Sequence, residues 1–130
     1  MVPEAGKRID VLVVDDDPIV RFLTVEVLRA SGWTVDAAPD GLTALDQLSN
    51  SSVRAIILDI RMPGLNGLGF LDSVKEPPPV VVLTGGSWDD EIATRSAKVF
   101  AHVRKPIEPS ALIGLIGEAL AESPMDPICA

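Results

Sequence analysis

The chain carries the stretch Ala55-Ile56-Ile57-Leu58-Asp59-Ile60-Arg61-Met62-Pro63-Gly64, in which four apolar residues lead into a carboxylate and then into a Pro-Gly turn. A short apolar run bounded by turn residues predicts a strand that is buried on both faces, as in a parallel sheet. Asp59 then lies where this strand leaves the sheet, and ligand sites of open α/β sheets cluster beyond those carboxyl ends. Asp is also common as a plain turn residue, so this stretch alone leaves both interpretations open.

Size and charge restrict the class of protein. A chain of 130 residues suits one domain with its own hydrophobic core. The net charge is −8 and the eleven Lys and Arg residues are scattered, which argues against direct contact with nucleic acid. No apolar run is long enough for a membrane span and residues 1–10 lack a signal-peptide core, so we expect a cytoplasmic protein without a membrane partner. The single cysteine, Cys129, excludes an internal disulfide.

Apolar runs and helical patterns alternate along the rest of the chain. We expect strands at residues 9–14, 33–38, 55–59, 80–83 and 99–104. The expected helices cover residues 18–31, 41–48, 67–75, 87–97 and a last segment that starts at Pro109. This alternation with short connections predicts a doubly wound α/β fold, in which helices cover both faces of a parallel sheet. We expect one domain over residues 9–121, with an N-terminal extension at 1–8 and a tail at 122–130.

The first expected helix has clear start and stop signals. Asp17 is placed to be its N-cap, Pro18 suits its first position, and Gly32 ends it. The apolar residues that recur at helical spacing along it are Ile19, Phe22, Leu23, Val27 and Ala30.

Polar residues of a particular kind follow four of the strands. They are Asp15 with Asp16, then Asp59, Thr84 and Lys105, and in a parallel sheet all of them lie on one edge. Three close carboxylates repel one another unless a cation joins them, and oxygen ligands without His or Cys favour Mg²⁺ over zinc. This arrangement suits phosphoryl transfer to a carboxylate, with Lys and Thr binding the oxygens of the transferred group.

At these residues the chain resembles a response-regulator receiver domain of two-component signalling, in the CheY-like superfamily. The matching motifs are Val-Val-Asp-Asp-Asp-Pro at 13–18, Leu-Asp-Ile-Arg-Met-Pro-Gly-Leu-Asn-Gly at 58–67, Val-Val-Leu-Thr-Gly at 81–85, and Lys105-Pro106. The resemblance covers about Asp10 to Ala121. It implies a flavodoxin-like (βα)5 fold, a five-stranded parallel sheet with strand order 2-1-3-4-5.

The resemblance also implies a role for each motif residue. Asp59 resembles the phospho-accepting aspartate, which takes its phosphoryl group from a phosphohistidine of a sensor histidine kinase or a histidine phosphotransfer protein. Mg²⁺, or Mn²⁺ in its place, would be bound by Asp15, Asp16, Asp59 and the backbone carbonyl of Arg61. Such a domain is a signalling switch, not a turnover enzyme, because it catalyses only its own phosphorylation and slow dephosphorylation.

The remaining implied roles concern the switch and its lifetime. Thr84 resembles the switch hydroxyl and Lys105 the ammonium that pairs with the phosphoryl group, and the bond before Pro106 is expected to be cis. Arg61 and Gly86 are expected to flank the route of the attacking water. The switched surface would be formed by the fourth helix, the fifth strand and the fifth helix, and would be read by a downstream protein or an output domain. Whether phosphorylation causes the domain to form a homodimer is left open.

One position departs from the family pattern. His102 stands where family members usually carry a Tyr or Phe whose rotamer reports phosphorylation. Alternation along the fifth strand places it on the same face as Phe100 and Arg104. Two roles of His102 remain open. It is either a titratable ring that moves with the switch or a plain surface histidine on an edge strand.

Two other interpretations use the same residues. A haloacid-dehalogenase-type phosphatase would use Asp15 as nucleophile and Asp17 as acid/base, but it leaves Asp59 unexplained and needs a late acidic pair that the chain lacks. A degenerate receiver would keep the fold and act only as an interaction module. The presence of Asp16, Asp59, Thr84 and Lys105 argues against this second alternative.

Overall fold

A five-stranded parallel sheet forms the centre of the protein. The computed structural model describes residues 7–60, 66–85, 92 and 95–122. The strand order is β2-β1-β3-β4-β5 and every neighbouring pair is parallel. The strands are β1 (Lys7–Val14), β2 (Val35–Ala38), β3 (Ser51–Asp59), β4 (Val80–Thr84) and β5 (Ala101–Arg104). The predicted flavodoxin-like parallel sheet is therefore confirmed, including its strand order.

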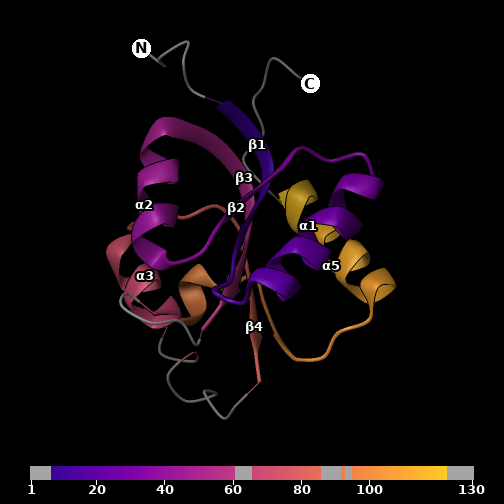
Figure 1. Ribbon diagram of the computed structural model, residues 1–130. Coiled ribbons are helices and arrows are strands. Elements are labelled where there is room, and N and C mark those ends of the chain that lie inside the picture. The colour runs from indigo at the N-terminus through magenta and orange to yellow at the C-terminus, as the bar shows by residue number, and fades with distance from the viewer. Residues whose placement is uncertain (1–6, 61–65, 86–91, 93–94, 123–130) are drawn as a thin grey trace.

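Helices cover both faces of this sheet. They are α1 (Pro18–Ala30), α2 (Gly41–Asn50), α3 (Gly67–Ser73) and α5 (Pro109–Glu122), with a short 3-10 turn, η1 (Ser96–Lys98). Figure 1 shows α2 and α3 on one side of the sheet, and α1 and α5 on the other. The helix expected at residues 87–97 falls largely outside the described residues. Within the described part of the chain, no helix is long and apolar enough to cross a membrane.

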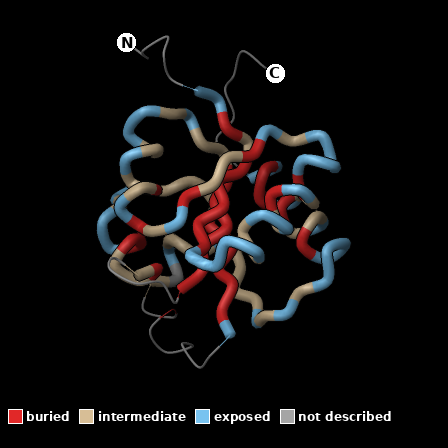
Figure 2. The backbone as a smooth tube through the Cα atoms, viewed as in Figure 1, coloured by how far each residue is buried: buried red, intermediate tan, exposed pale blue. Residues whose placement is uncertain are grey.

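The sheet separates two apolar clusters. On the side of α2 and α3, Ile56 and Leu58 of β3 pack with Phe70. On the side of α1 and α5, Ile57 of β3 packs with a second cluster that includes Leu28. Successive residues of β3 thus point into different clusters. Figure 2 shows the central strands of the sheet largely in red, which marks buried residues. This two-sided burial explains why the central strands read as continuous apolar runs.

The predicted helix signals act as expected. The Asp17 carboxylate accepts hydrogen bonds from the backbone N–H groups of Ile19 (2.9 Å) and Val20 (3.2 Å), so Asp17 is the N-cap of α1. Asp40 caps α2 in the same way. Its carboxylate accepts a hydrogen bond from the backbone N–H of Thr43, and this bond lowers the pKa of Asp40. Gly32 has φ of 97°, a conformation that glycine adopts readily, and α1 ends two residues before it.

Several element boundaries differ from the prediction. β3 begins at Ser51 instead of Ala55, and β1 at Lys7 instead of Ile9, because these polar strand starts pair with each other as Lys7 with Ser51. The apolar pattern contains no sign of that backbone pairing. At other ends the elements are two residues shorter than expected. β2 starts at Val35, β5 starts at Ala101, and α3 ends at Ser73, where Val74 turns to an extended conformation.

The apolar residues that predicted α1 are mostly not the ones that it buries. Ile19, Phe22 and Leu23 are 70%, 62% and 56% exposed, whereas Val25 and Leu28 are buried. The helix is therefore confirmed but its expected apolar face is wrong. α1 carries apolar residues around most of its circumference, so the spacing alone did not single out the face that meets the sheet.

Candidate functional site

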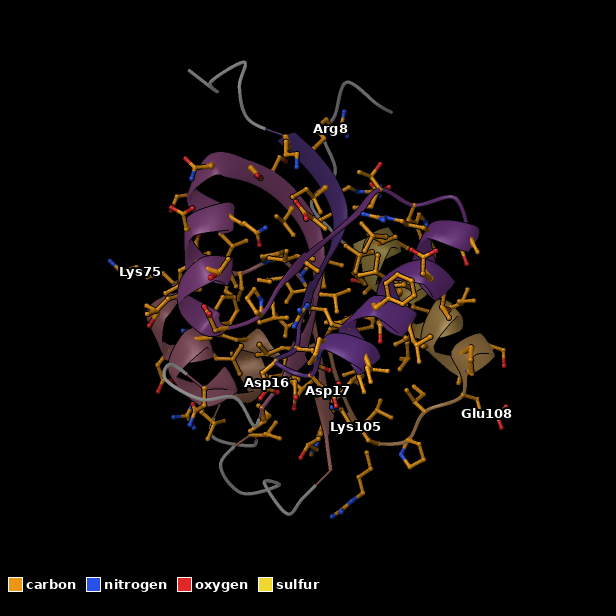
Figure 3. All side chains as sticks on the ribbon, viewed as in Figure 1. Arg8, Asp16, Asp17, Lys75, Lys105 and Glu108 are labelled. Atoms are coloured by element: carbon orange, nitrogen blue, oxygen red, sulfur yellow. The ribbon has the colours of Figure 1, made fainter. Side chains whose placement is uncertain are left out.

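The predicted site residues meet at one end of the sheet. Asp15 follows β1, Asp59 is the last residue of β3, Thr84 is the last of β4, and Lys105 follows β5. These positions are brought together because the strands are parallel and end at the same edge. In Figure 3, Asp16, Asp17 and Lys105 lie at this edge, while Arg8 lies at the opposite end of the sheet.

Three carboxylates form the centre of the site. One oxygen from each of Asp15, Asp16 and Asp59 lies within 4.8 Å of the others. Asp15 and Asp59 are buried, with exposed fractions of 4% and 7%, whereas Asp16 is exposed. The Lys105 Nζ atom lies 3.4 Å from Asp59 Oδ2 and 3.5 Å from Asp15 Oδ2. The ammonium group therefore pairs with both buried carboxylates.

The charges and donor atoms of this site fit a hard divalent cation. Three carboxylates lie close together here, and among the described ion pairs Lys105 is the cation that contacts Asp15 and Asp59. Like charges at such distances disfavour one another. The ligand atoms that Asp15, Asp16 and Asp59 offer are carboxylate oxygens, which Mg²⁺ prefers. Because Asp16 is exposed, water or a phosphate group can reach the site from its side.

The turn between β1 and α1 is fixed at several points. The backbone N–H of Asp15 donates to Ala38 O (3.1 Å), and its Oδ1 accepts from the backbone N–H of Asp17 (3.0 Å). The carbonyl of Asp15 accepts a 2.8 Å hydrogen bond from Arg21 Nη1. Sequence reasoning missed Arg21. The available signal was a cationic residue close to the start of the helix that follows the acidic motif.

Thr84 and Lys105 are joined through their backbones. Thr84 is fully buried, and its carbonyl accepts a hydrogen bond from the Lys105 N–H at 2.8 Å. The Lys105–Pro106 bond is cis, as expected from the family resemblance. Arg61 and Gly86, which were expected to contribute a carbonyl ligand and to flank the water route, lie outside the described residues.

His102 is half-buried on β5 and lies opposite Val82 in the register. Its neighbours Ala101 and Val103 pack into the apolar cluster on the side of α1 and α5. Alternation therefore turns His102 toward the other face of the sheet, the face to which Val82 contributes its side chain. His102 does not lie among the residues that form the carboxylate site.

Gly67 lies in the motif at 58–67, but sequence reasoning assigned it no role. Its N–H donates to Ile60 O (3.0 Å) at the point where α3 approaches the end of β3. A Cβ atom on Gly67 would lie 2.7 Å from Ile60 Cα and 2.8 Å from the carbonyl oxygen of Asp59. Only glycine allows this approach beside Asp59. The signal was a glycine at the start of a helix, directly after an Asn that caps it.

A groove opens between α1 on one side and, on the other, the segment after β5 and the start of α5. Its volume is about 270 Å³, and it is lined by Val20, Leu23 and Val27 on one side and by Ile107 and Leu112 on the other. Lys105 also lines this groove. The groove and the carboxylate site therefore share Lys105.

Comparison with known proteins agrees with this geometry. The family model described as "Response regulator receiver domain" matches residues 11–117. The transcriptional regulatory protein GlrR of Escherichia coli (strain K12) is 33% identical over 121 residues, which are 90% of this chain and 27% of that protein. A protein-glutamate methylesterase/protein-glutamine glutaminase 1 of Anaeromyxobacter dehalogenans is 44% identical over 77 residues, which are 58% of this chain and 22% of that protein.

Solved structures show the same fold. The receiver domain protein (CheY-like) from Methanospirillum hungatei JF-1 has a TM-score of 0.79 and 26% sequence identity, with coverage of 90% of this chain and 95% of that one. The chain spans about a quarter of the length of the two curated relatives above. The family match over residues 11–117, together with the shared fold, shows that the chain belongs to the response regulator receiver domain family.

Proposed function

We propose that Asp59 accepts a phosphoryl group and that the domain works as a phosphorylation-dependent switch. The observation that carries this proposal is the convergence of three carboxylates within 4.8 Å, with the Lys105 Nζ 3.4 Å from Asp59. Asp59 is the buried carboxylate at the end of the central strand β3, between strands that supply Asp15 and Thr84. The functional unit is proposed to be residues 9–121.

The reaction is a transfer from nitrogen to oxygen. A carboxylate oxygen of Asp59 attacks the phosphorus atom of a phosphohistidine on a partner, the P–N bond breaks, and its electron pair stays on the histidine nitrogen. Lys105 Nζ and the Thr84 hydroxyl bind the oxygens of the transferred group. Asp15, Asp16 and Asp59 would hold Mg²⁺, or Mn²⁺ in its place, which would neutralise part of the charge on the transferred group.

The partner is proposed to be a sensor histidine kinase or a histidine phosphotransfer protein, in the cytoplasmic compartment typical of response regulators. The exposed apolar side chains Ile19, Phe22 and Leu23 support a docking surface on α1. The adjacent groove between α1 and α5 shares Lys105 with the carboxylate site, so a partner seated there lies close to Asp59.

The output step is proposed to run through β5. Thr84 is buried, and its backbone carbonyl is hydrogen-bonded to the backbone of Lys105, so movement of Thr84 toward the phosphoryl group is expected to displace the end of β5. His102 on β5 follows this change. It is the only histidine of the chain, so its ring protons give one set of NMR signals, and we expect them to shift on phosphorylation. Unchanged signals would remove His102 from the switch.

The decisive experiment is incubation with Mg²⁺ and acetyl phosphate, followed by intact-mass measurement. We expect one phosphoryl adduct that is lost in Asp59→Asn and retained in Asp72→Asn, a matched change on the exposed side of α3. An adduct that persists in Asp59→Asn, or that maps to Asp15, would contradict the proposal.

In the same assay, Arg61→Ala is expected to change the lifetime of the adduct, and an unchanged decay rate would reject that role for Arg61.

A further inference from the structure

Asp16 has an unusual position among the three carboxylates. It is exposed, and within the described part of the chain no group donates a hydrogen bond to its side chain and no cation pairs with it. Asp15 and Asp59, in contrast, are buried and both lie beside Lys105. The direction of the Asp16 carboxylate therefore depends on the backbone that carries it.

That backbone is the peptide plane between Asp15 and Asp16. A peptide unit is planar, so fixing the carbonyl of Asp15 also fixes the orientation of the Asp16 N–H and the direction in which the chain continues. The carbonyl of Asp15 accepts its hydrogen bond from Arg21 Nη1 at 2.8 Å. Helix side chains lean toward the N-terminus of their helix, which lets Arg21 on α1 reach back to this plane.

We propose that Arg21 is a positioning residue for the cation site, acting on Asp16 through the Asp15 carbonyl. This inference rests on the proposed function, because it assumes that Asp16 is a ligand of Mg²⁺. The guanidinium group is charged and planar, and its hydrogen bond to a partly buried carbonyl holds the turn in one orientation. Groups that orient metal ligands in this way commonly affect metal affinity by about 10-fold to 100-fold.

The positive charge of Arg21 would change Mg²⁺ affinity in the opposite direction to its positioning role. A guanidinium near a divalent cation repels it, so removal of this charge alone would strengthen Mg²⁺ binding. Positioning predicts weaker binding in Arg21→Met, and charge repulsion predicts tighter binding. The sign of the change therefore separates the two effects.

The chain offers a matched control on the same helix. Arg29 also lies on α1 and also donates to a backbone carbonyl of a neighbouring strand, from Nη2 to Val35 O at 3.0 Å, but it is in the last turn of the helix. Arg29→Met makes the same change in charge and in side-chain type as Arg21→Met. It should not alter the Asp15–Asp16 turn.

The test is calorimetric titration of the whole chain with Mg²⁺, without a phosphodonor. We expect Arg21→Met to weaken binding by about 10-fold or more and Arg29→Met to leave it within about twofold of the unchanged chain. Arg21→Lys keeps the charge with a single donor nitrogen, and its affinity is expected to lie between those of the unchanged chain and Arg21→Met. This second variant keeps the test valid if Arg21→Met folds poorly, which urea unfolding without Mg²⁺ would reveal.

Several results would overturn the inference. Equal or tighter Mg²⁺ binding in Arg21→Met, or tighter binding in Arg21→Lys, would show that Arg21 does not position the site. Equal weakening by Arg21→Met and Arg29→Met would assign the effect to α1 in general. An unchanged chain that binds no Mg²⁺ would overturn the cation site of the proposed function together with this inference, whereas normal binding by every variant would overturn this inference alone.

Discussion

At the scale of single residues, the site depends on contacts that are decided by a few atoms. Asp59 is held beside Lys105 by the end of β3, and the backbone around it is approached closely by Gly67. The close approach of Gly67 leaves no room for a side chain, because two of the three nearest atoms belong to the backbone of Asp59 and Ile60.

Gly67→Ala is expected to destabilise the fold. The added Cβ would lie 2.7 Å from Ile60 Cα, so α3 must shift away from β3, and overpacking of this kind costs about 1–3 kcal/mol. The same shift should reduce phosphorylation of Asp59. Urea unfolding and labelling with acetyl phosphate measure the two effects.

The matched control is Gly114→Ala on α5. Apart from the neighbouring backbone of α5 itself, no described atom lies within 4 Å of a Cβ at Gly114, so alanine is expected to stabilise α5 by about 0.5–1 kcal/mol through its higher helix propensity. The two substitutions should therefore change stability in opposite directions. Equal effects would mean that the close approach at Gly67 is not important.

At the scale of the elements, α1 depends on its N-cap. Asp17→Ala removes the acceptor for two backbone N–H groups and should lower the free energy of unfolding by about 1 kcal/mol, whereas Asp17→Ser should retain most of the stability. Labelling by acetyl phosphate should survive in Asp17→Ser. Loss of labelling in that variant would instead give Asp17 a part in the chemistry, as the phosphatase interpretation requires.

The C-terminal part of α3 is connected to the segment before β5. Arg95 makes two hydrogen bonds to the Asp72 carboxylate, at 2.7 and 2.8 Å, and Lys98 Nζ donates to Leu71 O at 2.7 Å. The hydrogen bond from Arg95 lowers the pKa of Asp72 below its usual value of 3.8. Both contacts join α3 to residues next to the proposed output strand.

This pair predicts a pH-dependent contribution to stability. Because the folded-state pKa of Asp72 is lowered, the contribution is fully present above the unfolded-state pKa near 3.8 and is lost as the pH falls through the lower folded-state value. Asp72→Asn should therefore be less stable than the unchanged chain at neutral pH and equal to it in strong acid. Urea unfolding over a pH series measures this, with the exposed Asp46→Asn as control. A deficit that is constant with pH would contradict it.

The elements also show how far the sequence was informative. The order of strands and helices and the meeting of Asp15, Asp16, Asp59 and Lys105 were predictable, because buried parallel strands are apolar and their ends share an edge. The start of β3 at Ser51 was not predictable, because it depends on backbone pairing with β1, which polar side chains do not encode. The roles of Arg21 and Gly67 were missed because they depend on three-dimensional approach to a carbonyl oxygen.

At the scale of the whole molecule, apolar surface is distributed unevenly. Ile19, Phe22 and Leu23 are exposed together on α1, beside the groove that Lys105 also lines. On the opposite side of the sheet, Leu42 of α2 is 67% exposed but lies away from that groove. The two positions thus allow the effect of docking to be separated from the effect of surface apolarity.

Phe22→Ser is expected to slow phosphotransfer from a histidine kinase without changing labelling by acetyl phosphate, since a small donor needs no docking surface. Stability should change by no more than about 0.5 kcal/mol, because Phe22 is largely exposed. Phosphotransfer profiling with purified histidine kinases identifies the donor for this comparison. Leu42→Ser should alter neither reaction, and equal slowing by both variants would argue against a docking role for α1.

The lengths of the strands have a consequence for the behaviour of the protein at high concentration. The edge strands β2 and β5 have four residues each, whereas β1 and β3 in the interior have eight and nine. An edge strand exposes unpaired backbone groups to which another chain can add, and a short edge offers few of them. Edge-to-edge aggregation is therefore disfavoured at both sides of the sheet, so the domain is expected to stay monodisperse at concentrations where a long exposed edge would aggregate.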